Sequence, residues 1–178
     1  LNTLDKSASC VLSEGNLKYI TDHSTQTLLK GTFNLTNKHY WEVSVSGIGG
    51  DGSAGGVGIA NPSALSKDGA YAVWAANVLQ YNGVNGNKSD GFGGSSASFG
   101  ASYTTGDIVG IAVDVPSGTI QFFKNNSSQG TITDSAITAQ ANSVGLFPIL
   151  SNNSTSGSRS FIANFGQDSS FAGGKTAQ

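Results

Sequence analysis

One stretch decides the fold: Gly100-Ala-Ser-Tyr-Thr-Thr-Gly-Asp-Ile-Val-Gly-Ile-Ala-Val-Asp-Val-Pro-Ser-Gly-Thr-Ile-Gln-Phe-Phe-Lys-Asn-Asn-Ser-Ser-Gln-Gly130. Every second residue in one part of it is bulky and apolar, a period of two that predicts a β-strand with one buried row: Val109, Ile111, Val113 and Val115. Pro116 and Gly118 suit a tight turn, because proline presets φ and glycine adopts a positive φ. We therefore expect two β-strands joined at Pro116-Ser117-Gly118, with the chain turning back again at Asn125-Asn126.

Length and composition are typical of one large all-β domain. The chain has 178 residues, of which 25 are glycine and only 11% are charged. Abundant turn residues between many short alternating runs favour a two-sheet antiparallel β-sandwich. No apolar period of helical type is sustained over three turns, so we expect little helix. No apolar run reaches the length that spans a bilayer, so we expect no membrane insertion.

The chain divides into a lead-in, a sandwich and a tail within one structural domain. Short alternating pieces in residues 1–30 predict edge strands that pack on the sandwich, which we assign to residues 31–168. Residues 169–178 are polar and are expected to fray. Within the sandwich, Asn82-Gly83 predicts a type I′ hairpin turn, and the segment 82–100 is expected to be a polar loop.

Charge and cysteine usage exclude several classes of partner. Nine basic and eleven acidic residues give a net charge of −2 without any Lys/Arg cluster, so nucleic acid is not expected as a partner. Cys10 is alone, which excludes an intrachain disulfide and a cysteine metal site, and its apolar neighbours predict a buried thiol. Asp51-Gly52-Ser53 and the segment 87–91 lack the spacing of a calcium loop. We expect no metal and no other cofactor.

The residues also offer little for catalysis. His23 and His39 lie in contexts typical of structural histidines. Glu14 and Glu42 do not form the two-carboxylate motif that glycosidases of sandwich fold carry. No Gly-x-Ser-x-Gly elbow is present. Asp114 is predicted to stabilise its own turn. We therefore expect no enzymatic activity, while an atypical carbohydrate-active enzyme, with two carboxylates converging in one cleft, stays open as a third alternative.

Five segments in order resemble the SPRY domain, the C-terminal part of the B30.2 module. The hairpin counts as one of the five and carries two motif pieces, Gly106-Asp107-Ile108-Val109-Gly110-Ile111 and Ile120-Gln121-Phe122-Phe123-Lys124-Asn125. The other four motif segments are His39-Tyr40-Trp41-Glu42-Val43, Val57-Gly58-Ile59-Ala60, Gly145-Leu146-Phe147-Pro148-Ile149 and Ala163-Asn164-Phe165-Gly166. Asn126 departs from the family, which usually has glycine there. The resemblance implies a concanavalin-like jelly roll that binds peptides or protein surfaces through rim loops without catalysis.

Loops on a rigid scaffold are where recognition usually resides, and aromatic rings beside amides and hydroxyls suit it. The candidate ligand-binding residues are Tyr71, Tyr81, Asn82, Phe92, Asn126 and Arg159. Two readings stay open for several of them. Tyr81 and Phe92 could belong either to the core or to a ligand contact. Arg159 could be either a solvated loop charge or a contact to a carboxylate or a glycan. Trp41 and Trp74 are assigned to the core.

The loops of this chain, rich in Gly, Ser, Asn and Thr and poor in charge, are similar to those of SPRY-like domains in tailed-phage virion proteins. The resemblance implies a receptor-binding or decoration domain of a phage structural protein, located on the virion surface. Its partners would be a cell-surface glycan or protein and other virion proteins, with homo-oligomerisation through the parent protein left open. The alternative is a cytoplasmic SPRY adaptor that binds a short peptide motif of a partner protein.

Overall fold

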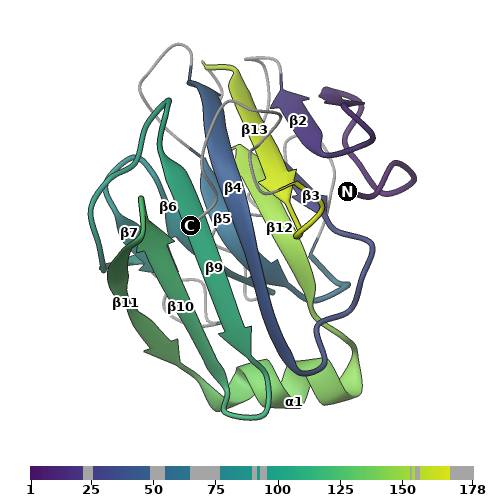
Figure 1. Ribbon diagram of the computed structural model, residues 1–178. Coiled ribbons are helices and arrows are strands. Elements are labelled where there is room, and N and C mark those ends of the chain that lie inside the picture. The colour runs from purple at the N-terminus through teal and green to yellow at the C-terminus, as the bar shows by residue number, and fades with distance from the viewer. Residues whose placement is uncertain are drawn as a thin grey trace.

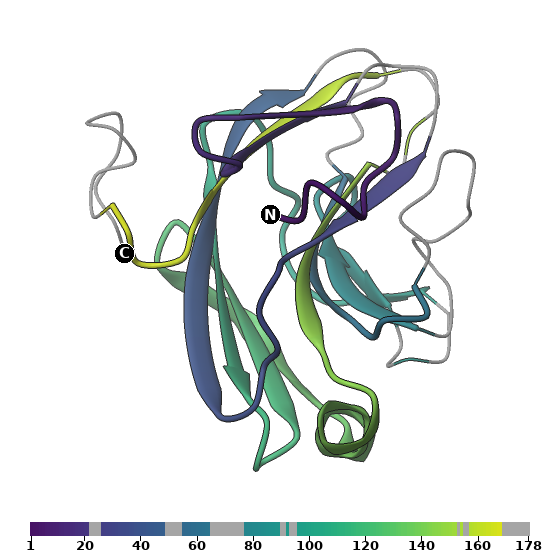
Figure 2. The same ribbon diagram turned by 90° about the vertical axis from the view of Figure 1, so that its right-hand side faces the viewer.

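The computed structural model describes residues 1–21, 26–48, 55–64, 77–89, 92, 96–152, 154 and 157–168 (Figure 1). These residues form two antiparallel sheets, and one short helix, α1 (Ser135–Ser143), is present among them. Figure 2 shows the sheets as two facing layers with α1 at one end. The predicted two-sheet antiparallel sandwich is confirmed, as is the scarcity of helix.

Each sheet runs antiparallel between neighbouring strands. The seven-stranded sheet has the order β1 (Cys10–Ser13), β2 (Lys18–Thr21), β13 (Arg159–Asn164), β4 (Lys38–Ile48), β9 (Ile108–Asp114), β10 (Thr119–Lys124) and β11 (Ser127–Thr133). The six-stranded sheet has the order β3 (Thr27–Lys30), β12 (Phe147–Asn152), β5 (Gly56–Ala60), β6 (Val78–Asn82), β7 (Asn87–Ser89) and β8 (Ser96–Ser98). The middle of the first sheet is therefore formed by strands from distant parts of the chain.

The main hydrophobic core lies between the two sheets. The predicted inward row of β9 and the residue after it is buried: Val109, Ile111, Val113 and Val115. Trp41 is buried in the same cluster, as expected, together with Val43 and Val45 from the same strand. A smaller cluster, on the other side of the six-stranded sheet, contains Leu28, Ala60, Ala64, Val78 and Ile149. Cys10 is buried, as its neighbours predicted.

Both turns of the β9–β10–β11 segment have the expected local chemistry. The Ser117 N–H donates to Asp114 Oδ1 over 3.1 Å, and Gly118 has a φ of 63°. Asn125 and Asn126 have φ values of 46° and 66°, so both central residues of the second turn are left-handed, as a type I′ turn requires. Asparagine tolerates this region better than most residues, which explains how Asn126 replaces the glycine usual in the SPRY motif.

A cluster of polar side chains joins the start of β9 to the end of β10, and we call it the hairpin clamp: Asp107, Lys124 and Asn125. Asn125 Nδ2 donates to Asp107 Oδ1 over 2.6 Å, and Asn125 Oδ1 accepts from the Ile108 N–H over 2.9 Å. Lys124 Nζ lies 3.3 Å from Asp107 Oδ2, which also accepts from the Thr104 N–H over 2.8 Å. The Gly-Asp and Lys-Asn pieces of the motif are thus in direct contact.

The connection between β6 and β7 differs from the predicted type I′ turn at Asn82-Gly83. The positive φ, 71°, is at Gly86, and the chain makes a longer turn over residues 83–86. A Cβ atom at Gly86 would lie 1.9 Å from the Gly100 carbonyl oxygen, so this close backbone approach requires glycine. The segment 82–100, predicted as a loop, also contains β7 and β8, whose polar sequences show no alternation of bulky residues.

Helix α1 was not predicted as an element. Asp134 caps it, because its side chain accepts from the Ala136 N–H over 2.9 Å. Only Ile137 and Ala141 are buried, so this short helix carries too few apolar residues to show a period in the sequence.

The lead-in contributes to both sheets, through β1 and β2 on one side and β3 on the other. Lys30 anchors its first residues: Lys30 Nζ lies 3.0 Å from Asp5 Oδ2, and the Asn2 N–H donates to the Lys30 carbonyl over 3.0 Å. The expected tail at residues 169–178, together with His23, Asp51 and Trp74, lies outside the described residues.

The hairpin clamp predicts a pH-dependent contribution to stability. Partial burial raises the pKa of Asp107, but hydrogen bonds from Thr104, Asn125 and Lys124 outweigh it and hold that pKa below its ordinary value of 3.8. A lowered folded-state pKa stabilises the fold above that value, and the contribution is lost as pH falls through the folded-state pKa. We expect Asp107→Asn to lower the free energy of unfolding by about 1 to 3 kcal/mol at neutral pH, because charged hydrogen bonds are lost.

Urea unfolding of both proteins across the acid range checks this. The difference between wild type and Asp107→Asn is expected to shrink as pH falls below about 3.8. A difference that stays constant to the lowest pH would contradict the role of the Asp107 charge.

Candidate functional site

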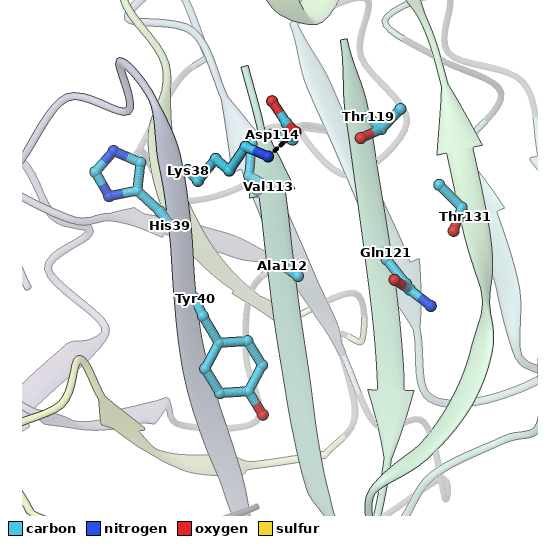
Figure 3. A pocket seen from close by; sticks show the side chains of 9 residues that line it. All are labelled: Lys38, His39, Tyr40, Ala112, Val113, Asp114, Thr119, Gln121 and Thr131. Atoms are coloured by element: carbon cyan, nitrogen blue, oxygen red, sulfur yellow. Dashed lines mark ion pairs between the residues drawn. The ribbon is translucent and has the colours of Figure 1, made fainter. Parts of the chain in front are cut away.

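The outer face of the seven-stranded sheet carries a hollow of about 410 Å³ over β4, β9, β10 and β11, which we call the outer-face groove (Figure 3). Strand register explains it. Tyr40 on β4 lies opposite Ala112 on β9, which in turn lies opposite Gln121 on β10. The short side chain of Ala112 leaves a depression between two long ones. The residues that line the groove are Lys38, His39, Tyr40, Ala112, Val113, Asp114, Thr119, Gln121 and Thr131.

Tyr40 forms one wall of the groove and is 47% exposed. Its hydroxyl donates to Glu42 Oε1 over 2.9 Å, and the Phe123 ring meets its ring edge-on with centroids 6.4 Å apart. Partial burial raises the pKa of Tyr40, and the hydrogen bond to Glu42 and its charge raise it further. The phenol therefore stays neutral near pH 7. The lack of a side chain at Gly110 leaves room for this ring, since a Cβ there would lie 2.6 Å from the Tyr40 oxygen.

The opposite wall is polar and uncharged. Gln121 Nε2 donates to Ser128 Oγ over 3.0 Å, which holds the amide in place beside the hydroxyl of Thr131, its partner in register on β11. At one end, Lys38 Nζ lies 3.0 Å from Asp114 Oδ2, the ion pair drawn in Figure 3. The hydrogen bond from Lys38 and that from the Ser117 N–H hold the pKa of Asp114 below its ordinary value. The two charges of the groove thus compensate each other.

The groove offers mainly uncharged hydrogen-bonding and apolar contacts. Within the described ranges, no three His, Cys, Asp or Glu residues lie close enough to hold a metal ion. The one carboxylate of the lining, Asp114, is engaged by Lys38 and its own turn. His39 Nε2 accepts from the Thr36 N–H over 3.3 Å, and its ring lies near Phe33. What remains is an aromatic ring, an amide and hydroxyls, which suit a neutral ligand.

The structure does not bring together the five predicted site residues that it describes. Tyr81 is fully buried and its hydroxyl donates to the Ala101 carbonyl. Its ring packs against Tyr103 and Phe122. Of the two alternatives for Tyr81, the core position is therefore correct. Phe92 is 7% exposed and belongs to the same core cluster. Neither ring presents a surface to a ligand.

The remaining candidates are dispersed. Arg159 begins β13 and is fully buried between β2 and β4, so the prediction of a solvated loop charge is wrong. Asn82 is also buried, at the end of β6, where its side chain bonds the following turn. Asn126 is exposed at the tip of the β10–β11 hairpin. Tyr71 lies outside the described residues. None of the five described candidates lines the outer-face groove.

Sequence reasoning missed the residues that do line the groove. Tyr40 precedes the inward Trp41, and Gln121 lies between the inward Ile120 and Phe122, so alternation alone places both on the outer face. It does not say that they share one groove, because that depends on the register of three strands.

The fold is a two-sheet antiparallel β-sandwich, and its outer face carries a groove with an exposed aromatic ring. The chain belongs to the SPRY family: the SPRY domain model matches residues 38–168. The structure is similar to the SPRY domain of human HERC1, with a TM-score of 0.71 and 17% identity over 89% of this chain and 94% of that one. A second human SPRY domain matches with a TM-score of 0.64 and 17% identity, over 90% and 97% of the two chains.

A further similar structure is that of stonustoxin, with a TM-score of 0.68 and 16% identity over 91% of this chain and 26% of that one. A comparison with curated protein sequences finds no significant match. SPRY domains are in general non-catalytic modules that bind other proteins. In the part of the chain that the structure describes, no helix has the length and apolar character of a membrane-spanning segment.

The contact between Gly110 and Tyr40 generates a test of the groove geometry. In Gly110→Ala, the new methyl group must displace the Tyr40 ring, which is half exposed and able to move. We expect the free energy of unfolding to fall by only about 1 kcal/mol, because the ring moves instead of the backbone. Nuclear Overhauser contacts between the Tyr40 and Phe123 rings are expected to disappear. Retention of those contacts together with a large loss of stability would contradict this geometry.

Proposed function

We propose that this SPRY domain is a non-catalytic recognition module of a phage structural protein, displayed on the virion surface, which contacts a host-cell surface molecule through the outer-face groove. The observation that carries the proposal is the convergence of Tyr40, Gln121 and Thr131 around the short Ala112 on an exposed sheet face. An exposed ring beside a fixed amide and a hydroxyl suits recognition without chemistry.

The composition of the chain supports the display on a particle surface. Only 11% of residues are charged, 25 are glycine, and the single cysteine is buried. A chain of this kind keeps its stability without a disulfide and presents a nearly neutral surface.

A protein is the ligand class that we favour over a glycan, because SPRY domains in general bind other proteins. The groove agrees with an uncharged protein segment, since its own two charges pair with each other. A second candidate function is an adaptor domain that binds a short peptide inside a cell, and the similarity to two human SPRY domains favours it.

The test is binding of the fluorescently labelled domain to a panel of intact bacterial strains. Three forms are compared: wild type, Gln121→Ala, and Asn142→Ala as an amide-to-alanine control on the exposed side of α1. We expect saturable binding to some strains. Gln121→Ala is expected to weaken it about fivefold to tenfold, since a ligand hydrogen bond is lost, and Asn142→Ala to leave it unchanged.

Two treatments of the cells identify the ligand class. Loss of binding after protease treatment supports a surface protein, whereas competition by free surface glycans supports a glycan. Binding to no strain contradicts display for host recognition, and equal binding by wild type and Gln121→Ala excludes the outer-face groove as the contact.

A further inference from the structure

In the part of the chain that the structure describes, the two sheets have four edge strands, and three of them are short or covered. Open edges expose unpaired backbone groups, which proteins usually block with charges, proline, brevity or a covering segment. β1 has four residues, and Lys6 Nζ donates to the carbonyl of its first residue, Cys10, over 2.7 Å. β8 has only three residues. The Asn2 N–H of the lead-in bonds the Lys30 carbonyl of β3.

β11 is the exception among these edges. It is seven residues long, its sequence Ser-Ser-Gln-Gly-Thr-Ile-Thr has no charged residue and no proline, and four of its residues are exposed. Among the described strands, β10 is its only hydrogen-bonded neighbour. Charge, proline and brevity, three of the usual means of blocking an edge, are therefore absent from β11.

The backbone pairing shows which groups of β11 are open. The Asp134 N–H donates to the Gly118 carbonyl over 2.9 Å, so residues 134 and 132 face β10. Along an antiparallel strand, the backbone N–H and C=O groups of successive residues point alternately to the two sides. Those of Thr131 and Thr133 therefore point to the open side. Within the described ranges neither residue's backbone makes a bond on that side.

The open stretch is bounded at its other end. A register shift between Phe122 and Phe123 marks a bulge in the β10–β11 pair, and Gln129 Oε1 accepts from the Ala101 N–H over 2.9 Å. The chain's own segment around Ala101 therefore borders β11 there. Thr131 to Thr133 stay accessible, directly beside the outer-face groove, which Thr131 also lines.

We propose that an extended, uncharged segment of a partner protein adds to β11 as an eighth strand of the seven-stranded sheet. This inference rests on the proposed function and specifies how its protein ligand is held. The backbone of the segment pairs with Thr131 and Thr133, and its alternate side chains lie toward Gln121 and the rest of the groove. The groove is neutral overall, so uncharged side chains fit it.

A second copy of the domain fits this edge less well than a peptide segment. Pairing of β11 with β11 would align only the short open stretches of the two copies. The few hydrogen bonds and small area would fall below the roughly 1,200 Å² that stable protein interfaces bury. A flexible segment can instead follow the edge and place its side chains over the groove.

The experiment uses a displayed library of random nonapeptides selected on the wild-type domain, with two variants for comparison. Thr133→Pro removes one outward N–H without affecting the ladder to β10, where that N–H takes no part. Thr133→Val changes the same side chain but keeps the N–H. We expect the selected peptides to bind Thr133→Val as they bind wild type, and Thr133→Pro about tenfold more weakly.

A second measurement uses only the wild-type domain, so it holds even if Thr133→Pro does not fold. Each selected peptide is N-methylated at one residue at a time. Strand addition predicts that methylation at alternate residues abolishes binding while methylation between them does not. Hydrogen exchange at the Thr131 and Thr133 amides is expected to slow when the peptide is bound.

The outcomes separate this inference from the proposed function. Peptides that lose affinity for Gln121→Ala, but bind Thr133→Pro normally and tolerate methylation at every residue, overturn strand addition and leave the groove as the site. The absence of any selected binder also overturns it. Self-association of the domain that Thr133→Pro abolishes would make a second copy the occupant, against the proposal.

Discussion

The hairpin clamp is the contact on which the outer face of the molecule depends. Asp107 precedes β9, Lys124 ends β10, and Asn125 bonds both Asp107 and the first backbone N–H of β9. These bonds fix the register of β10 against β9. A slip of one residue would move every side chain of β10 to the other face. Gln121 would then point into the core, and the outer-face groove would not form.

Within the SPRY motif segments, the side chains that hold the fold together differ from those that line the outer-face groove. Asp107 and Asn125 hold the hairpin, and Trp41 is buried in the core. The groove is lined by their neighbours on the other face, such as Tyr40 and Gln121. This separation explains how one fold can present different ligand surfaces, because residues that hold the sandwich together are distinct from those that meet a partner. The motif identifies the fold, and the contact that we propose lies on the outer face.

Local pattern predicted the parts of the structure that depend on local chemistry. The buried row from Val109 to Val115 and both turns of the hairpin follow from alternation and from residues that favour turns. Arg159 was predicted to lie in a loop because its sequence neighbours are typical of loops. They do not indicate that Arg159 begins a strand that pairs with β2 and β4. The groove was not predicted, because Tyr40 and Ala112 are far apart in sequence and meet only through the pairing of β4 with β9. Pairing of distant strands depends on the whole core, and a single sequence does not show it.

The most direct test of this account is a double-mutant cycle across the hairpin clamp. Asp107→Ala removes the carboxylate, and Asn125→Gly removes the amide while keeping a residue that tolerates the left-handed φ of this turn. Free energies of unfolding are measured for wild type, both single variants and the double variant. The account predicts a coupling energy of about 1 to 3 kcal/mol, because each side chain loses its partner when the other is removed. A coupling energy near zero would contradict it.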